Sequence, residues 1–285
     1  MNTQRFFWIM MLLLLAACTR QQEVDEAMAT LSPIQVLLVS TDFGVGQPRV
    51  SFAFFDGENV AQNVASVSLQ VFPVDGGEAV WEGTAVSYTD YLIPYWVFYP
   101  ELPTAGYWGV KTELTLTDGT TYSPGFVMET LAKTNAPALG AVAPPSENKT
   151  VFTESDLSKL SSGTDVNPAL YQMTVAEAVK TGRPTVVGFV TPGLCQTRWC
   201  GPTLESVEAV QEAVGDEAAN FIHIEVYDDF QALTLSAPMV EWGLATEPWV
   251  FVLDKDGRIV SRLSGPLSPT ELQEQLAPLL SSGVG

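Results

Sequence analysis

RPTVVGFVTPGLCQTRWCGP, residues 183–202, joins an apolar run directly to two closely spaced cysteines. Thr185–Val190 is short, apolar and rich in β-branched residues, which is typical of a strand covered on both faces. Cys195 and Cys200 follow, and Gly201-Pro202 favours the first turn of a helix, where proline is best tolerated. A thiol at this position lies near unpaired N–H groups and the positive end of a helix dipole, which favour the thiolate. These residues therefore predict a strand, a reactive loop and a helix in succession.

The spacing of the two cysteines limits how they can pair. On a continuous α-helix, residues five apart are turned by about 140° and separated by about 7.5 Å along the axis, too far for a disulfide. Either Cys195 lies in the loop before the helix, or the first turn unwinds when the bond forms; Pro202 favours the loop. Closing so small a loop removes little chain entropy, so a redox role explains the pair better than stability does. A passive structural bridge stays open as the alternative.

Residues 1–18 have the pattern of an export signal. Arg5 lies in a short polar start, and the apolar run that follows is too short to span a bilayer. The run ends in Leu15-Ala16-Ala17-Cys18, which resembles the bacterial lipobox and implies lipidation of Cys18. We expect a lipoprotein on the extracytoplasmic face of a bacterial membrane, in the cell envelope, where disulfides persist. Residues 19–32 are polar and acidic and are expected to form a flexible tether.

Residues 33–131 carry short β-rich runs separated by turn residues such as Asp56-Gly57 and Asp118-Gly119. About seven strands at this spacing predict an antiparallel, immunoglobulin-like β-sandwich. The expected strands are 34–40, 49–55, 66–74, 79–87, 91–99, 106–117 and 120–129. Aromatic residues are dense here and are expected to fill the core, although a binding surface or an adaptor role stays open; they are Tyr91, Tyr95, Trp96, Phe98, Tyr99, Tyr107 and Trp108.

Residues 132–150 are rich in proline, alanine and small polar residues and are predicted to be an interdomain linker. Residues 151–285 then alternate β and α patterns, as a sheet with parallel strands requires. The only histidine, His223, has no convincing ligand set near it in sequence and is interpreted as a packed or surface strand residue. The expected elements are short helices at 151–162 and 174–181, a helix at 203–214, a strand at 221–227 and a closing amphipathic helix at 268–280.

Four features of this second region carry a resemblance to a known family. They are the strand 186–190, Gly201-Pro202 directly after Cys200, the Glu247-Pro248 junction, and a hairpin that ends at Gly265 before the last helix. Together they resemble the thioredoxin fold of membrane-tethered, extracytoplasmic proteins. In that family the junction proline is cis and lies against the reactive disulfide, where its neighbour contacts substrate, which implies the same for Pro248 and Glu247. We therefore predict two domains, an all-β immunoglobulin-like sandwich followed by an α/β thioredoxin fold.

The sequence also departs from that family. Thioredoxins have Trp-Cys-Gly-Pro-Cys, whereas Trp199-Cys200-Gly201-Pro202 is followed by Thr203. Cys195 is expected to replace the missing cysteine from the other side, which gives a Cys-x4-Cys motif. The family's buried acid in the preceding strand corresponds to Gly188, so its usual proton acceptor is absent. A second resemblance, with one residue inserted, is to the Thr-Pro-Gly-Cys motif of Q-type peroxiredoxins, carried by Thr191-Pro192-Gly193-Leu194-Cys195.

The first functional hypothesis is a thiol–disulfide oxidoreductase in which Cys195 attacks a partner's disulfide and Cys200 resolves the mixed disulfide. Arg198 would favour the Cys195 thiolate if it points inward, and Glu247 would oppose it. The alternatives are a non-catalytic scaffold locked by a structural disulfide, a peroxiredoxin-like thiol peroxidase, and a copper chaperone that uses the two cysteines with His223.

Composition limits the partners. The formal net charge of −20 makes nucleic acid and anionic membrane surfaces poor partners for the folded part. The expected partners are protein thiols or disulfides, or a membrane redox partner, with the lipid as the membrane anchor. No cofactor and no resident metal are expected.

Overall fold

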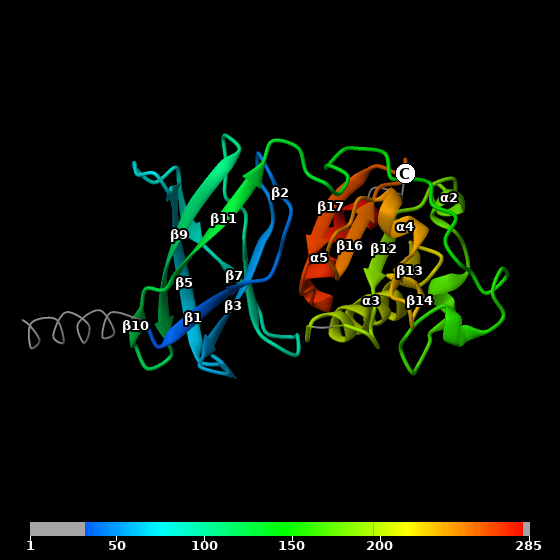
Figure 1. Ribbon diagram of the computed structural model, residues 1–285, viewed down its shortest axis with the longest axis horizontal. Coiled ribbons are helices and arrows are strands. Elements are labelled where there is room, and N and C mark those ends of the chain that lie inside the picture. The colour runs from blue at the N-terminus through cyan, green and yellow to red at the C-terminus, as the bar shows by residue number, and fades with distance from the viewer. Residues whose placement is uncertain (1–31, 196, 282–285) are drawn as a thin grey trace, which may run out of the picture.

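The computed structural model describes residues 32–195 and 197–281. The predicted export signal, Cys18 and most of the predicted tether lie outside the described residues. Within the described ranges, none of the helices is both long enough and apolar enough to cross a membrane. The described chain is mostly β-sheet with few helices (Figure 1).

The N-terminal part, residues 32–131, contains two β-sheets that pack face to face as a β-sandwich. One sheet consists of β1 (Ile34–Leu38), β3 (Val50–Asp56), β4 (Asn59–Val60), β7 (Val86–Tyr88) and β8 (Tyr95–Phe98). The other consists of β2 (Phe43–Gly44), β5 (Val64–Pro73), β6 (Trp81–Thr84), β9 (Gly106–Leu116), β10 (Thr121–Tyr122) and β11 (Gly125–Leu131). Apolar side chains from both sheets, among them Phe52, Phe98 and Leu114, form one core between them.

Two of the expected strands are divided in the structure. The run 79–87 forms β6 in one sheet and β7 in the other, because the chain crosses between the sheets near Ala85. The run 120–129 is interrupted at Pro124, which has no N–H to continue the ladder, so β10 and β11 are separate. The expectation of one continuous strand was wrong in both places.

The aromatic residues are divided among three environments. Trp96, Phe98 and Trp108 fill the sandwich core as expected. Tyr99 and Tyr107 are 40% and 57% exposed, so the expectation was wrong for these two residues. Tyr91 and Tyr95 lie in a separate apolar cluster that contains Trp199 from the other half of the chain. Part of the aromatic set therefore serves the junction between the two halves.

The C-terminal part, residues 150–281, has a four-stranded sheet in the order β13-β12-β16-β17. The strands are β12 (Thr185–Val190), β13 (Asn220–Glu225), β16 (Trp249–Leu253) and β17 (Ile259–Ser264). β12 runs parallel to β13 and antiparallel to β16, and β17 is antiparallel to β16. Every residue of β12 is buried, which explains its continuous apolar sequence.

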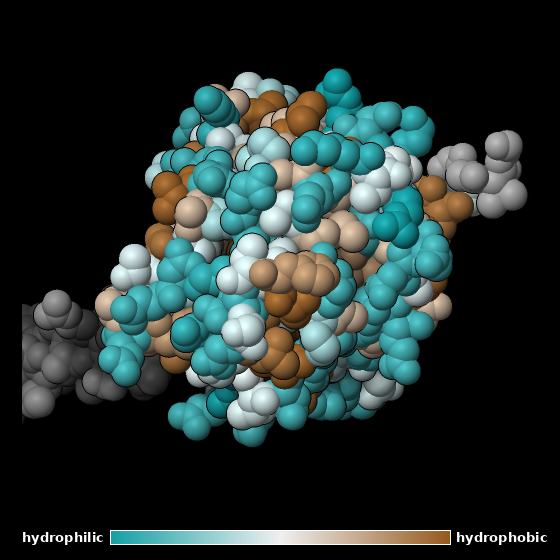
Figure 2. Space-filling model, turned by 90° about the vertical axis from the view of Figure 1, so that its right-hand side faces the viewer, coloured by the Kyte–Doolittle hydropathy of each residue, from teal (hydrophilic) through white to brown (hydrophobic). Residues whose placement is uncertain are grey.

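Helices cover both faces of this sheet. α3 (Cys200–Val214) and α5 (Pro269–Ser281) pack on one face, and α2 (Val175–Ala178) and α4 (Ala237–Glu241) pack on the other. Two short 3-10 helices, η1 (Leu157–Lys159) and η2 (Pro168–Tyr171), and a small hairpin of β14 (Tyr227–Asp229) and β15 (Thr234–Leu235) complete the described elements. The outer face of this part is mainly hydrophilic, with a small apolar patch near its centre (Figure 2).

Local hydrogen bonds explain where the helices differ from expectation. Residues 151–162 contain the 3-10 turn η1 and no α-helix. At the start of this segment the Thr150 and Thr153 hydroxyls bond nearby backbone groups and form a turn instead of a helix. The capping box of Thr174 and Glu177 is confirmed, although α2 is one turn long. α3 begins at Cys200, three residues earlier than expected.

The predicted linker, residues 132–150, contains no helix or strand but is fixed to the C-terminal part. Val142 forms a β-bridge with Arg258. The side-chain carbonyl of Asn148 accepts a hydrogen bond from the N–H of Val175 at 2.8 Å, and the indole of Trp242 donates to Ser146 at 3.0 Å. The segment therefore packs along the outside of the sheet.

A buried ion pair joins the two halves. The Arg49 guanidinium donates to the Glu271 carboxylate from Nε at 2.6 Å and from Nη2 at 2.7 Å. Its remaining donors reach the carbonyls of Ser264 and Pro266 at 2.8 and 2.7 Å, and the Tyr95 hydroxyl donates to Glu271 at 2.6 Å. The side chains of the pair are 3% and 0% exposed. Because Arg49 donates four hydrogen bonds and Glu271 accepts three, the burial of both charges is compensated.

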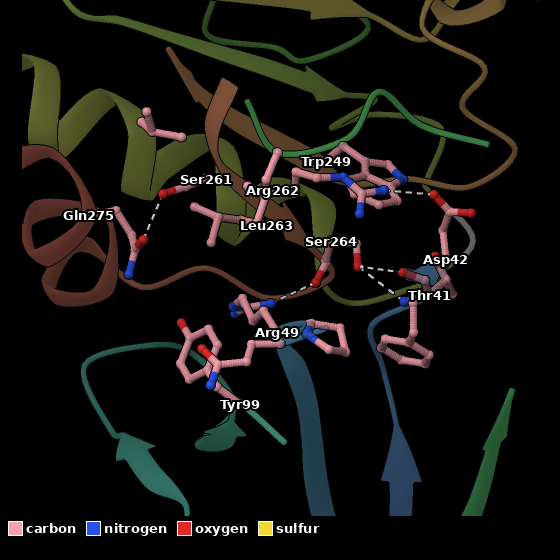
Figure 3. Close-up of a pocket in the computed structure, with 15 residues that line it drawn as sticks. Thr41, Asp42, Arg49, Tyr99, Trp249, Ser261, Arg262, Leu263, Ser264 and Gln275 are labelled. Carbon is pink, nitrogen blue, oxygen red and sulfur yellow. Dashed lines mark hydrogen bonds and ion pairs between the residues drawn. The ribbon is translucent and has the colours of Figure 1, made fainter. Parts of the chain in front are cut away.

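A small pocket lies beside this pair (Figure 3). Arg262 forms an ion pair with Asp42 at 2.8 Å and lies over the ring of Trp249, and the N–H of Thr41 donates to the Ser264 hydroxyl at 3.0 Å. The cavity volume of 90 Å³ is far below the roughly 300 Å³ of small-molecule sites. We therefore interpret it as a gap in the junction.

Breaking the buried pair tests its role. Arg49→Met keeps the alkyl packing but leaves Glu271 charged and short of donors, so we expect a loss of about 3–5 kcal/mol in the free energy of unfolding. Urea unfolding followed by tryptophan fluorescence measures it. Lys149→Met, which removes an exposed pair with Asp228, is the control and should cost less than about 1 kcal/mol. Equal effects for both variants would contradict the interpretation.

Candidate redox site

A disulfide joins Cys195 and Cys200, whose Cα atoms are 6.0 Å apart. Cys195 lies in the loop after β12, and Cys200 is the first residue of α3, so the bond spans the loop-to-helix junction as the spacing suggested. Cys200 is completely buried, whereas Cys195 is half-buried. Only one of the two sulfurs is therefore open to a partner.

The loop that carries Cys195 is held by Ser162. The Ser162 hydroxyl accepts a hydrogen bond from the N–H of Gly193 at 3.0 Å and lies 3.2 Å from the Thr191 hydroxyl. Glu225, at the end of β13, accepts hydrogen bonds from the Ser162 N–H and hydroxyl at 2.7 and 2.8 Å. A Cβ atom on Gly193 would lie 2.0 Å from the Ser162 carbonyl oxygen. Glycine is required there by this close approach.

A threonine hydroxyl lies beside the disulfide, nearer to the sulfur of Cys195. Oγ1 of Thr197 is 3.2 Å from the Cys195 sulfur and 3.9 Å from the Cys200 sulfur. A hydroxyl in this position can donate to a thiolate and stabilise it. Thr197 was not among the predicted site residues, although a hydroxyl residue between two cysteines was the available signal.

Trp199, the residue before α3, is held by the sandwich. Its indole stacks on the Tyr91 ring with an interplanar angle of 15°. The Tyr91 hydroxyl donates to the Trp199 carbonyl at 2.7 Å and lies 2.9 Å from the Thr203 hydroxyl. Tyr91 is distant in sequence, so no local pattern could have indicated this contact. The start of α3 therefore depends on a residue of the N-terminal part.

Glu247 lies beside the disulfide. The Glu247–Pro248 peptide bond is cis, the form that the resemblance implies, and Pro248 is buried. A carboxylate oxygen of Glu247 and the sulfurs of Cys195 and Cys200 all lie within 4.8 Å of one another. Burial, with the negative charge of Glu225 added, raises the pKa of Glu247 to about 7.

The remaining predicted residues have different surroundings. Arg198 is exposed, and Gly201 and Pro202 lie in the first turn of α3. His223 is buried, with Nε2 donating to the Val190 carbonyl at 2.8 Å and Nδ1 accepting from the Tyr171 hydroxyl. Burial lowers the pKa of His223.

The groups that could hold a metal do not include His223. Among the described residues, the one cluster with suitable spacing consists of Cys195, Cys200 and Glu247, and its two sulfurs are bonded to each other here. A copper site built from the two cysteines and His223 is therefore not assembled in this structure.

The chain resembles known proteins only weakly and over part of its length. No protein-family model matches the chain, and no curated protein matches it. Structural neighbours include thioredoxin-like proteins. A thiol:disulfide interchange protein of the thioredoxin family from Chlorobium tepidum TLS is 19% identical with a TM-score of 0.29, covering 38% of this chain and 86% of its own. A thioredoxin-like superfamily protein is 14% identical with a TM-score of 0.31 and the same two coverages.

A likeness of similar extent exists to CopC from Methylosinus trichosporium OB3b. It is 17% identical with a TM-score of 0.25 and covers 34% of this chain and 93% of its own. Likenesses as weak as these concern parts of the fold and say nothing about chemistry.

Tyr91→Phe tests the contact at the helix start. The change leaves the buried Thr203 hydroxyl without its tyrosine partner and removes one of two hydrogen bonds to the Trp199 carbonyl, which still accepts from the N–H of Thr203. We therefore expect a loss of roughly 1–3 kcal/mol in the free energy of unfolding. Tyr107→Phe, at an exposed tyrosine of the same sandwich, is the control and should change it by less than about 0.5 kcal/mol. Urea unfolding of both variants measures these free energies. Equal losses in the two variants would show that the Tyr91 hydroxyl does not support α3.

Glu247→Gln tests the unpaired carboxyl through the pH dependence of stability. The pKa of Glu247 is about 7 in the folded protein, against an ordinary value of 4.5. Between pH 4.5 and about 7 the folded state therefore binds more protons than the unfolded state does. Stability of the wild type should therefore fall relative to that of the variant as pH rises through this range, and the difference should level off above it. Urea unfolding of the oxidised proteins at several pH values measures this. A difference that does not vary with pH would contradict the assignment.

Proposed function

We propose that the protein is a lipid-anchored, extracytoplasmic thiol–disulfide oxidoreductase that exchanges disulfides through Cys195 and Cys200. The observation that carries the proposal is the unequal exposure of the bonded sulfurs: Cys195 is half-buried and Cys200 is completely buried. Exchange needs one sulfur that a partner can reach and a second sulfur that only the first can reach. A bridge that only stabilised the fold would not require this difference.

The arrangement of the C-terminal part supports a thioredoxin fold. Its sheet order β13-β12-β16-β17, with β12 and β13 parallel and the other pairs antiparallel, places the cysteines at the end of a central strand. The cis Glu247–Pro248 bond precedes β16 beside them. We propose two domains, an immunoglobulin-like sandwich at residues 33–131 and a thioredoxin-like domain at 151–285, joined by residues 132–150.

The proposed exchange has two steps. The Cys195 thiolate attacks one sulfur of a partner disulfide, a Cys195–partner bond forms, and the second partner sulfur leaves as a thiolate that takes up a proton. The Cys200 thiol then loses its proton and attacks the Cys195 sulfur, which re-forms the Cys195–Cys200 bond and releases the first partner sulfur. Two electrons pass to the partner. The same steps in reverse oxidise a partner dithiol.

Two features of the site favour a thiolate at Cys195. The N-terminus of the 15-residue helix α3 lies next to the disulfide, and its unpaired N–H groups stabilise negative charge there. The Thr197 hydroxyl, 3.2 Å from the Cys195 sulfur, can donate to it. Arg198 is exposed and is not needed for this stabilisation.

The cellular setting of the proposal comes from the sequence. Lipidation at Cys18 would hold the protein at the membrane with the site in an oxidising compartment. The net charge of −20 disfavours anionic partners such as nucleic acid. The proposed partners are protein thiols and disulfides, including a membrane redox protein.

Single-cysteine variants test the proposal. With glutathione disulfide as the probe, reduced Cys200→Ser should form a mixed disulfide at Cys195 that accumulates, because no second thiol resolves it. Reduced Cys195→Ser should react at least about tenfold more slowly, since Cys200 is buried. Mass spectrometry of acid-quenched samples gives both results.

Two other outcomes would replace the proposal. If neither variant reacts while folded, the bridge is structural and the protein is a scaffold. If Cys195 does not react with glutathione disulfide but is oxidised rapidly by hydrogen peroxide, a thiol peroxidase is favoured.

A further inference from the structure

The carboxyl group of Glu247 is held beside both sulfurs by the central sheet. Glu247 is two residues before Trp249, which pairs with Phe189 across β16 and β12, and the cysteines follow β12. One of its oxygens lies within 4.8 Å of both the Cys195 and the Cys200 sulfur. This distance allows proton transfer through one water molecule, or directly when the sulfurs separate on reduction.

Glu247 differs from the neighbouring carboxylate in its hydrogen bonds. Glu225 accepts from the N–H and hydroxyl of Ser162 and from the N–H of Val226, the last at 2.9 Å. The Oε2 atom of Glu247 is buried and has no hydrogen-bond partner among the described residues. Glu247 therefore has a carboxylate oxygen that is not committed to a hydrogen bond within the described part of the chain and can take up a proton.

The buried sulfur needs a proton acceptor. Cys200 begins α3, whose N-terminus favours a thiolate, but it is completely buried in the apolar cluster that includes Leu204 and Val207, and this desolvation opposes the charge. The strand before the cysteines, β12, supplies no carboxylate, because its residues are TVVGFV. A group on another element has to take the proton.

We propose that Glu247 accepts the proton of the Cys200 thiol when Cys200 attacks the mixed disulfide, and returns it in the reverse reaction. This inference rests on the proposed disulfide exchange. In the resolving step the S–H bond of Cys200 breaks, its proton passes to the Glu247 carboxylate, and the Cys200–Cys195 bond forms as the Cys195–partner bond breaks. The partner leaves as a thiolate, which takes up a proton, and Glu247 later releases its own to solvent.

The charges around Glu247 fit this role. The titratable groups placed near it among the described residues are Glu225 from β13, Tyr227 from β14, and the two thiols. Burial and the Glu225 charge bring the pKa of Glu247 to about 7. An acceptor with a pKa near the working pH can both take up and release a proton.

Rapid-quench kinetics separates the two steps of the exchange. Reduced wild type and Glu247→Gln are mixed with glutathione disulfide over about pH 5 to 9, quenched with acid, and analysed by mass for the mixed disulfide and the Cys195–Cys200 bond. A chelator is present throughout, because the reduced sulfurs and Glu247 could together hold a metal. Near-ultraviolet circular dichroism checks that the variant is folded.

We expect the resolving step of Glu247→Gln to be about 100-fold slower at neutral pH, so the mixed disulfide accumulates. The first step should not be slowed, because loss of the nearby Glu247 charge favours the Cys195 thiolate. The resolving rate of the wild type should show an inflection near pH 7 that the variant lacks. Glu247→Asp, which keeps a carboxylate, should recover part of the rate. Glu212→Gln, at an exposed position on α3, is the matched control and should behave as wild type.

The failures of the two proposals are distinguishable. If wild type exchanges and Glu247→Gln keeps both its resolving rate and its pH profile, the role of Glu247 is wrong and the oxidoreductase proposal stands. If reduced wild type forms no mixed disulfide, the oxidoreductase proposal fails and the role of Glu247 fails with it.

Discussion

The buried ion pair between Arg49 and Glu271 is the contact on which the arrangement of the two halves depends. Placing two charges in the interior is costly unless each has a full set of hydrogen bonds. Here the pair is bidentate, two backbone carbonyls also accept from Arg49, and Tyr95 donates to Glu271. Because these partners come from both halves, the cost of burying the two charges is compensated only when the sandwich packs against α5. That position also brings Tyr91 onto Trp199, directly before the buried cysteine. The sandwich therefore helps to hold the start of α3.

The candidate site combines groups of opposite character at short distance. One sulfur is accessible and the other is buried, and one carboxylate is fully hydrogen-bonded while its neighbour has a buried oxygen without a partner among the described residues. Differences of this kind divide chemical roles between residues of the same type. The Ser162 hydroxyl donates to the Glu225 carboxylate and accepts from the N–H of Gly193 in the cysteine loop. This one side chain therefore fixes both the position of the loop and the position of the Glu225 carboxylate, whose charge acts on Glu247.

The sequence predicted the parts of this site that are local in the chain. The buried strand, Cys195 in the loop and a helix directly after the cysteines follow from residues 183–202, because strand burial and proline placement leave clear local patterns, although α3 begins three residues earlier than predicted. Contacts between distant residues leave none, and the pairs Arg49 with Glu271, Tyr91 with Trp199, and Ser162 with Gly193 were not predicted. The errors in elements have two origins. Local hydrogen bonds of the Thr150 and Thr153 hydroxyls form a turn where a helix was expected, whereas the crossing near Ala85 pairs the two parts of one expected strand with different sheets. Glu247 was placed near the disulfide by resemblance alone, and its unpaired oxygen is visible only in the folded structure.

The reduction potential of the Cys195–Cys200 pair tests the central claim most directly. It is measured on the folded protein lacking residues 1–18 by equilibration with glutathione or dithiothreitol buffers, alkylation and mass analysis. The account predicts a value within the range of known exchange proteins, roughly −270 to −120 mV. A value below about −300 mV, with neither thiol reactive in the folded state, would contradict it and make the bridge structural.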